Sequence, residues 1–140
     1  MRFSKYNTKD SYGPIDNKTV LEQEDDVAHL KLSGNWRIPT WEEWEELWTK
    51  CTCTWTLDYN GTGVSGTSVT ATNGNSIFLP AAGYRSGTRL YNAGSSGNYW
   101  SSSVYTDSPF ARGICFNFSE LYMDHGERYS GFSIRPVWEE

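Results

Sequence analysis

Two short groups of ionisable side chains have the composition of a metal site. Asp25 and Asp26 precede His29 at a spacing that brings the three to one side of a helix. The segment 124–127, DHGE, places two carboxylates and an imidazole in a turn. Neither group has the further ligands that a metal site needs. We therefore interpret the first group as a salt-bridged helix surface and the second as a solvated turn, and we expect no metal and no cofactor.

Catalytic arrangements are also incomplete in this sequence. The glutamates of segment 42–46 share one face of a predicted helix, whereas the paired acids of a glycosidase face each other across a cleft. The serines of segment 101–103 have no His–Asp pair near them in the sequence and no G-x-S-x-G elbow. Cys115 has no identifiable base that would lower its pKa. The sequence predicts no catalytic residue, and we expect a protein that is not an enzyme.

The largest remaining group of polar and aromatic side chains lies between residues 100 and 137. Tyrosine buries a large area at a low cost in conformational entropy, and serine and glycine adapt around it, so these residue types suit a binding surface. The predicted binding surface consists of Tyr105, Asp107, Ser108, Phe110, Arg112, Gly113, Cys115, Asn117, Tyr122, Asp124, His125, Gly126, Tyr129 and Ser130. The alternative interpretation is an ordinary exposed face of a β-rich domain.

An alternating pattern would hold these residues in place. Ile114, Phe116 and Phe118 occupy every second position of a GICFNF motif, which is the period of a half-buried strand. The same alternation recurs in the segments 119–125, SELYMDH, and 131–137, GFSIRPV. We predict three strands with one face packed on the core and the other face free to carry the binding surface.

Two helices are predicted ahead of these strands. The first covers residues 21–32 and ends at Gly34, and acidic residues in its first turns complement the helix dipole. The second begins with Thr40 and Glu43, which are spaced as a capping box. Its apolar face consists of Trp41, Trp44, Leu47, Trp48 and Cys51. Its glutamates are expected on the opposite face, in solvent.

The remaining segments complete an α+β arrangement. Short strands are predicted at 52–56, 68–72 and 76–84, separated by turns and long ordered loops rich in glycine and asparagine. Residues 1–18 read as an irregular lead-in. We thus expect two helices followed by short antiparallel strands, in a single domain that spans residues 1–140.

Composition narrows the classes of partner. The net charge of −5 argues against a nucleic-acid-binding protein, and no apolar segment is long enough to cross a membrane. Three cysteines are too few for a disulfide framework, and pairing of Cys51 or Cys53 with Cys115 is left open. The first residues lack the apolar segment of a secretory signal. Because the chain starts in polar, turn-forming sequence, we expect a domain excised from a longer protein.

Four motifs occur in order along the chain: GNWRIPTWEEWEEL at 34–47, NGNSIFLPAAGYR at 73–85, YNAGSSGNYWSSS at 91–103 and RYSGFSIRPV at 128–137. With these motifs the chain resembles, over residues 5–137, bacterial and phage domains that have a C-type-lectin-like fold of the formylglycine-generating-enzyme type. It is similar in particular to the variable proteins of diversity-generating retroelements, which are common in gut Bacteroides and their phages. The resemblance implies a C-type-lectin-like fold for this chain.

The resemblance also implies how the predicted binding surface would arise. In such systems a reverse transcriptase copies a template repeat with errors at adenines, and the copy replaces the end of the gene. Template asparagine codons can become codons for every residue of the predicted binding surface, but not for Glu120, Met123 or Glu127. Residues 100–137 would be the variable region. Its constant frame would be Trp100, Phe116, Phe118, Phe132, Ile134 and Arg135.

Recognition is the function that the resemblance implies. The partner would be a protein or glycan on a cell surface, bound by a phage tail tip or a bacterial surface protein, with no role for nucleic acid or membrane insertion. The aromatic anchors would be Tyr105, Phe110, Tyr122 and Tyr129, and specificity would depend on Asp107, Arg112, Asp124 and His125. Motifs of the calcium-dependent sugar site are absent from the sequence, and no catalytic cysteine pair maps onto it. The alternatives are a non-diversified structural surface paralogue and a formylglycine-generating-type enzyme.

Overall fold

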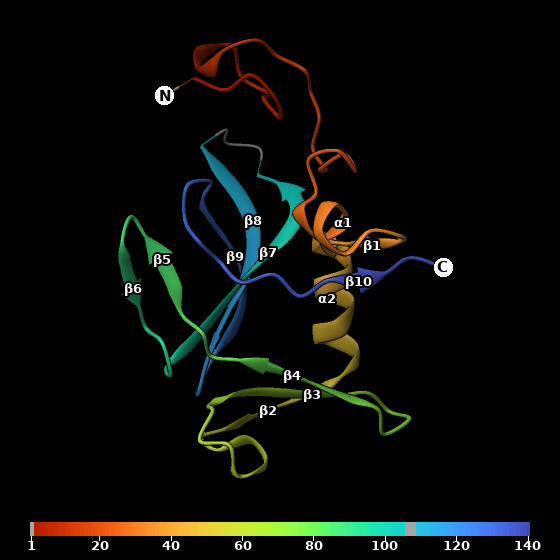
Figure 1. Cartoon of the computed structure of the whole chain (residues 1–140), viewed down its shortest axis with the longest axis vertical. Helices are drawn as coiled ribbons and strands as arrows, with labels where there is room; N and C mark the ends of the chain where they lie inside the picture. The colour runs from red at the N-terminus through yellow and green to blue at the C-terminus, as the bar shows by residue number, and fades with distance from the viewer. Residues whose placement is uncertain (1, 106–108) are drawn as a thin grey trace.

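The computed structural model describes residues 2–105 and 109–140, which form a mixed α+β arrangement (Figure 1). Two residues of the predicted binding surface, Asp107 and Ser108, lie outside the described residues. The elements are a 3-10 turn at Asp10–Tyr12, α1 Val27–Leu32, β1 Trp36–Arg37, α2 Trp41–Lys50, β2 Thr52–Thr56, a 3-10 turn at Tyr59–Gly61, β3 Gly66–Thr70, β4 Ser76–Pro80, β5 Tyr84–Ser86, β6 Arg89–Tyr91, β7 Ser96–Val104, β8 Phe110–Asn117, β9 Leu121–Glu127 and β10 Val137–Trp138.

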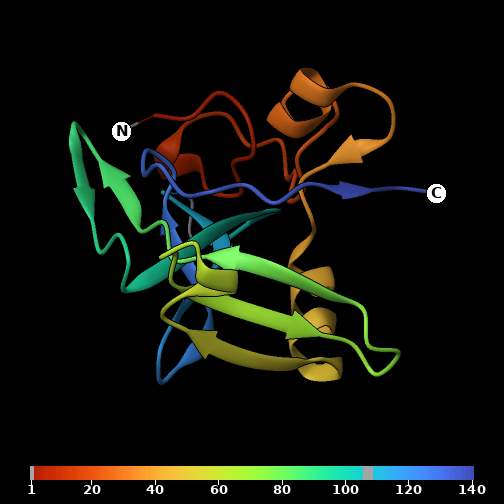
Figure 2. The same cartoon turned by 60° about the horizontal axis from the view of Figure 1, so that its bottom comes forward.

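The strands form four small antiparallel sheets. Strands β7, β8 and β9 make one three-stranded sheet, and β2, β3 and β4 make another. Strand β5 pairs with β6, and β1 pairs with β10 close to the C-terminus. Figure 2 shows the β2–β4 sheet beside α2, below the lead-in and α1. Among the described residues, no helix combines the length and the apolar character needed to cross a membrane.

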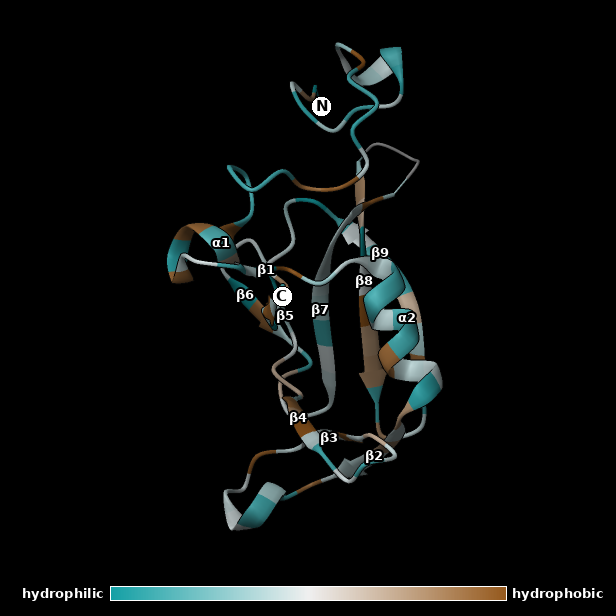
Figure 3. Cartoon of the chain, turned by 90° about the vertical axis from the view of Figure 1, so that its right-hand side faces the viewer, coloured by the Kyte–Doolittle hydropathy of each residue, from teal (hydrophilic) through white to brown (hydrophobic). Residues whose placement is uncertain are grey.

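Helix α2 confirms the predicted capping box. The backbone N–H of Glu43 donates to the Thr40 hydroxyl at 3.2 Å, and the backbone N–H of Thr40 donates to the Glu43 carboxylate at 2.8 Å. Along α2, hydrophilic segments are interrupted by paler and brown ones (Figure 3), and Trp44 of this helix is buried. Glu43 departs from the expected solvent-facing set because both of its oxygens bind the Arg37 guanidinium.

Helix α1 is shorter than predicted because its first residue is set by a buried aspartate. The prediction began this helix at residue 21, whereas α1 begins at Val27 and Asp26 is its N-cap. The Asp26 carboxylate accepts hydrogen bonds from the backbone N–H groups of Ala28, His29 and Ile38. These bonds hold Asp26 in an extended conformation, so the residues before it form turns instead of helix.

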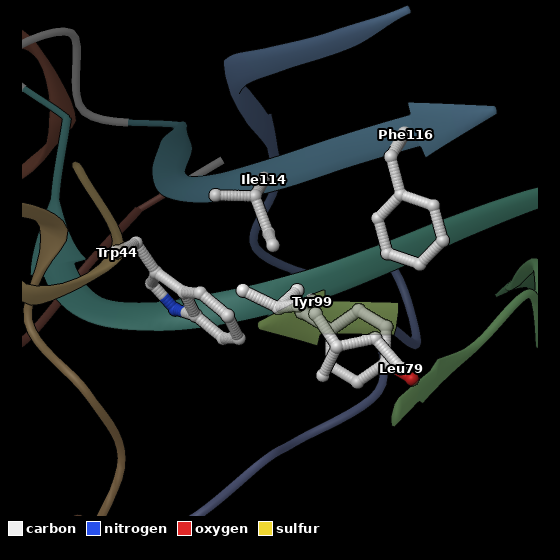
Figure 4. Packing of buried hydrophobic residues seen from close by; sticks show 6 residues of the cluster. Trp44, Leu79, Tyr99, Ile114 and Phe116 are labelled. Carbon is white, nitrogen blue, oxygen red and sulfur yellow. The ribbon is translucent and has the colours of Figure 1, made fainter. Parts of the chain in front are cut away.

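The core lies between α2, the β2–β4 sheet and one face of the β7–β9 sheet. Its fully packed members are Trp44, Val69, Leu79, Tyr99, Ile114 and Phe116. Figure 4 shows Trp44 from α2 and Leu79 from β4 against Tyr99, Ile114 and Phe116 of the sheet. The predicted burial of Ile114 and Phe116 is confirmed. The predicted half-buried alternation is wrong at this point of β8, because Gly113 and Cys115 are buried as well.

Two predicted frame residues are not packed in this way. Phe118 is 76% exposed, because β8 ends at Asn117 and the Asn117 carboxamide oxygen accepts hydrogen bonds from the backbone of Ser119 and Glu120. This turn directs Phe118 away from the core. Ile134 is also exposed, since the segment 131–137 is mostly irregular and joins the sheets through isolated bridges at its start.

Candidate ligand-binding groove

The register of β8 and β9 divides the predicted binding surface between two faces of one sheet. Arg112 lies directly opposite His125, and both share the face that carries the buried Ile114. Gly113 lies opposite Asp124, and Cys115 opposite Tyr122, on the other face. Adjacent residues of the prediction therefore point to opposite sides of the sheet. A single uniform face of the kind that the sequence suggested does not form.

An open groove of about 470 Å³ lies along β8 and β9 and continues to β5 and β7. We call it the β8–β9 groove. It gathers eight residues of the predicted binding surface: Phe110, Cys115 and Asn117 from β8, Tyr122, Asp124, His125 and Gly126 from β9, and Ser130 from the following loop. The described residues outside it are Tyr105, Arg112, Gly113 and Tyr129.

Residues upstream of the predicted variable region complete this groove. Tyr84 of β5, Asn92 of the loop after β6, and Ser96 and Asn98 of β7 line it. One signal in the sequence could have identified Asn98, because Ser96, Asn98 and Trp100 alternate along β7 with the core residue Tyr99. No local pattern predicts Tyr84, since the β5–β6 hairpin reaches the groove through long-range pairing of Arg85 with Gly131.

Stacked aromatic rings form one wall of the groove. The ring of Phe132 stacks on Trp100 with a centroid distance of 4.1 Å. Tyr84 meets Phe132 edge-on at 5.9 Å and stacks on Tyr91 at 5.4 Å. Phe132, predicted as part of the inward frame, thus packs over the face of the sheet that carries the groove. The series Tyr91, Tyr84, Phe132 and Trp100 connects the exposed hairpin with the sheet.

Gly126 and Gly113 lie at two places where other groups approach the sheet too closely for a side chain. A Cβ atom on Gly126 would lie 2.6 Å from Cζ of Phe132. A Cβ atom on Gly113 would lie 2.6 Å from the backbone oxygen of Tyr99, which cannot move away as a side chain can. Packing therefore demands glycine at position 113, although the sequence placed this residue among the freely variable ones.

The middle of the groove is polar. Cys115 is only 7% exposed, so the expectation of an outward, accessible cysteine is wrong. Burial raises the pKa of the Cys115 thiol, partly offset by hydrogen bonds with the Tyr122 hydroxyl and with Asn98. The bond to Cys115 in turn raises the pKa of Tyr122. A thiol held protonated at neutral pH is a poor nucleophile and metal ligand.

The Asp124 carboxylate lies beside this pair and accepts no hydrogen bond from any residue in the described ranges 2–105 and 109–140. Nδ1 of His125 lies 3.8 Å from it, beyond hydrogen-bond distance but close enough for an ion pair when the imidazole is protonated. Glu127, by contrast, accepts a hydrogen bond from the Tyr129 hydroxyl. Among the described residues of the groove, Asp124 is thus the carboxylate whose hydrogen-bond acceptors are open to a ligand.

An aromatic cluster at one end of β8 and β9 shares Phe110 and His125 with the groove, although the register places both residues on the face that carries Ile114. The Arg112 guanidinium lies over the ring of Trp41 at 4.6 Å and over that of Tyr105 at 5.6 Å. The imidazole of His125 stacks on Tyr105 at 4.6 Å and meets Phe110 edge-on at 4.9 Å. Arg112 thus packs on Trp41 of α2 and on Tyr105, and Tyr105 packs on Arg112 and His125. These contacts leave Arg112 and Tyr105 less available to a ligand.

The other ionisable groups singled out in the sequence have structural partners. The Asp25 carboxylate binds the Tyr6 hydroxyl and the Lys5 ammonium group. The Asp26 carboxylate caps α1 and accepts from the backbone N–H of His29, so both carboxylates are engaged with groups other than the His29 imidazole. Carboxylate oxygens of Glu22, Glu24 and Asp25 lie close together, but all three residues lie on the surface and Lys5 binds two of them. The three cysteines have free thiols.

Comparison of the chain with family models, with curated proteins and with solved structures finds no match to any of them.

Proposed function

We propose that this chain is a ligand-binding display domain with a C-type-lectin-like fold, and that the β8–β9 groove is its binding site. The observation that carries the proposal is that eight residues of the predicted binding surface line one open groove of about 470 Å³. A concave site with aromatic walls and a few polar groups is typical of ligand recognition. The order of two helices followed by antiparallel strands supports the fold assignment.

Tyr122 is the principal aromatic anchor in this proposal. Its side chain lines the groove and is 42% exposed, so a ligand can cover it and bury a large area. Asn98 and Ser130 offer hydrogen bonds around it. The partner is a protein or glycan on a cell surface, met by the domain at a phage tail tip or on a bacterial surface.

Diversification by a retroelement is the second part of the proposal. We infer that Asn117, Tyr122, Asp124 and Ser130 are variable positions and that Gly113 is constant, because a Cβ there would collide with the Tyr99 backbone. Sequencing of the locus tests this inference. The expected result is a reverse transcriptase gene beside a near-identical repeat with asparagine codons at the variable positions and a glycine codon at position 113.

A locus without a repeat and without a reverse transcriptase would contradict diversification and favour the structural surface paralogue. The formylglycine-generating-type enzyme is the less supported alternative. An enzyme of this type would have to use Cys115 as a reactive thiol. Burial raises the pKa of this thiol, which makes it a poor nucleophile.

Binding is tested by selection on the purified domain. We expect a phage-displayed random peptide library or a glycan array to yield ligands whose binding falls about tenfold or more in Tyr122→Ala, since an anchor of this kind contributes about 2 kcal/mol. Phe118→Ala is the matched control, because Phe118 is an aromatic residue outside the groove and is even more exposed than Tyr122, at 76%. Ligands that bind both variants as tightly as the parent chain would exclude the groove as the site.

A further inference from the structure

We propose that the β8–β9 groove recognises a basic side chain, arginine or lysine, presented by a protein partner, with the Asp124 carboxylate as its counter-ion. This inference rests on the proposed function, since it takes the groove to be a ligand site and names the chemistry that fills it. It follows from the state of Asp124, the rings around it and the charge of the groove.

The Asp124 carboxylate is the group in the groove that most needs a partner. Its side chain is 36% exposed, and no described residue donates a hydrogen bond to it. It lies close enough to the Cys115 thiol and the Tyr122 hydroxyl to raise the pKa of both groups. A carboxylate that is partly removed from water gains most from a charged donor, because bonds between ionised groups are the strongest available to it.

The rings along the groove suit a cation as well. Tyr84 and Phe132 form one wall, and Tyr122 stands beside Asp124. A guanidinium or ammonium group placed over a tyrosine or phenylalanine ring is attracted by the negative face of the ring. The structure already contains this kind of contact on the far side of the sheet, where Arg112 lies over the rings of Trp41 and Tyr105.

The described residues of the groove disfavour an anionic ligand. Asp124 and Glu127 are the acidic ones, His125 is the one side chain there that can carry a positive charge, and neither lysine nor arginine is among them. Arg85 of β5 is not one of the lining residues, and its guanidinium donates to the backbone oxygen of Thr88 in the β5–β6 turn. The net charge of −5 adds a long-range attraction for basic partners.

A basic side chain is favoured over a neutral sugar for the same reason. A sugar hydroxyl can donate to Asp124, but it leaves the negative charge of the groove uncompensated. An arginine can donate two parallel hydrogen bonds to the carboxylate while its planar group stacks on an aromatic ring. The volume of about 470 Å³ accommodates such a side chain together with its flanking backbone.

Titration of the isotope-labelled domain with Nα-acetyl-arginine methylamide tests the proposal, followed by amide chemical shifts. The matched probe is the citrulline analogue, which has the same shape without the charge. We expect the arginine probe to shift the amides of Asn98, Tyr122 and Asp124 and to bind about tenfold or more tightly than the citrulline probe. Raised salt should weaken the binding.

Asp124→Asn should reduce affinity for the arginine probe about tenfold and abolish its preference over citrulline. Glu45→Gln removes one negative charge on the exposed face of α2, outside the groove, and should leave both affinities unchanged. Unaltered amide shifts of Ile114 and Phe116 in each variant verify that the fold is intact. The same variants applied to peptides selected on the parent chain should show an arginine or lysine whose contribution is lost in Asp124→Asn.

Equal binding of the two probes, or no shift of the groove amides with either, would overturn the basic-side-chain proposal. Ligands that depend on Tyr122 but not on Asp124, including sugars from the array, would overturn it too while leaving the groove as the binding site. If the selection described above yielded no ligand whose binding depends on the groove, the proposed function itself would be wrong.

Discussion

Individual residues of the predicted binding surface turn out to have very different roles. Tyr122 and Asp124 are accessible in the groove, whereas Cys115 is buried between them and the rest of the sheet. Gly113 is a packing requirement, because its lack of a side chain permits close approach of the Tyr99 backbone and of the Phe132 ring. A residue type that suits a binding surface is thus not evidence that a position can vary.

Gly113→Ala tests this point at the scale of one methyl group. Its Cβ would lie 2.6 Å from a backbone oxygen, so we expect a loss of about 1–3 kcal/mol in unfolding free energy. Gly126→Ala is the control, because its Cβ would meet the movable ring of Phe132 and should cost less. Urea denaturation measures both values. An equal or smaller loss at position 113 would return Gly113 to the variable set.

The secondary-structure elements near the site depend on caps and turns more than on intrinsic propensity. Helix α2 begins at a reciprocal capping box and turns Trp44 into the core. The short α1 begins where the Asp26 carboxylate accepts three backbone hydrogen bonds. Strand β8 ends where Asn117 closes a turn, which is why Phe118 faces solvent. The ends of the elements therefore set which residues reach the groove.

Thr40→Ala removes the side-chain half of the capping box of α2. We expect a loss of about 1 kcal/mol in unfolding free energy, within the range of about 0.5–2 kcal/mol found for such caps. Thr49→Ala makes the same substitution inside the same helix, where the hydroxyl donates only to backbone oxygens of the preceding turn. Alanine favours a helix interior, so this control should lose nothing. Indistinguishable denaturation midpoints for the two variants would contradict the assigned role of Thr40.

At the scale of the whole molecule, the lead-in is an integral part of the domain. The backbone oxygens of Lys5 and Tyr6 accept hydrogen bonds from the Arg128 guanidinium, which follows β9. The Asp16 carboxylate accepts bonds from the backbone N–H groups of Tyr6 and Asn7. Figure 1 shows this segment above the β7–β9 sheet, at the end opposite the β2–β4 sheet. Hydrogen bonds between segments that are far apart in the sequence thus hold the lead-in against the residues that follow β9.

Acidification should release the lead-in before it unfolds the core. Burial raises the pKa of Asp16, but backbone hydrogen bonds outweigh this and hold the pKa below its ordinary 3.8. Hydrogen bonds from Tyr6 and Lys5 lower the pKa of Asp25 in the same way. A carboxyl group with a lowered folded pKa stabilises the fold above pH 3.8 and loses that contribution as the pH falls further.

Protection of amides against hydrogen exchange measures this release. As the pH falls below 3.8, the protection factors of Tyr6 and Asn7 should fall well before those of Ile114 and Phe116. Asp16→Asn should reproduce the loss at neutral pH. A parallel decline of all four amides would mean that the lead-in and the core unfold as one unit.

The sequence by itself determined the features that are encoded within a few neighbouring residues. The capping box of α2 is one, and the burial of Ile114 and Phe116 by period-two alternation is another, because local hydrogen bonds and the pleat of a strand act at short range. The general α+β order followed from these patterns. They do not contain the pairing of distant strands.

Only the tertiary structure decided which residues form the groove. The register of β8 against β9 places Arg112 and Asp124 on opposite faces of the sheet, although arginine and aspartate suit a binding surface equally well. Long-range pairing brought Tyr84 and Asn98 to the groove, and the close approach of the Tyr99 backbone left space only for glycine at position 113. Pairing register and ring stacking join residues that are remote in the chain, so no pattern of neighbours could predict them.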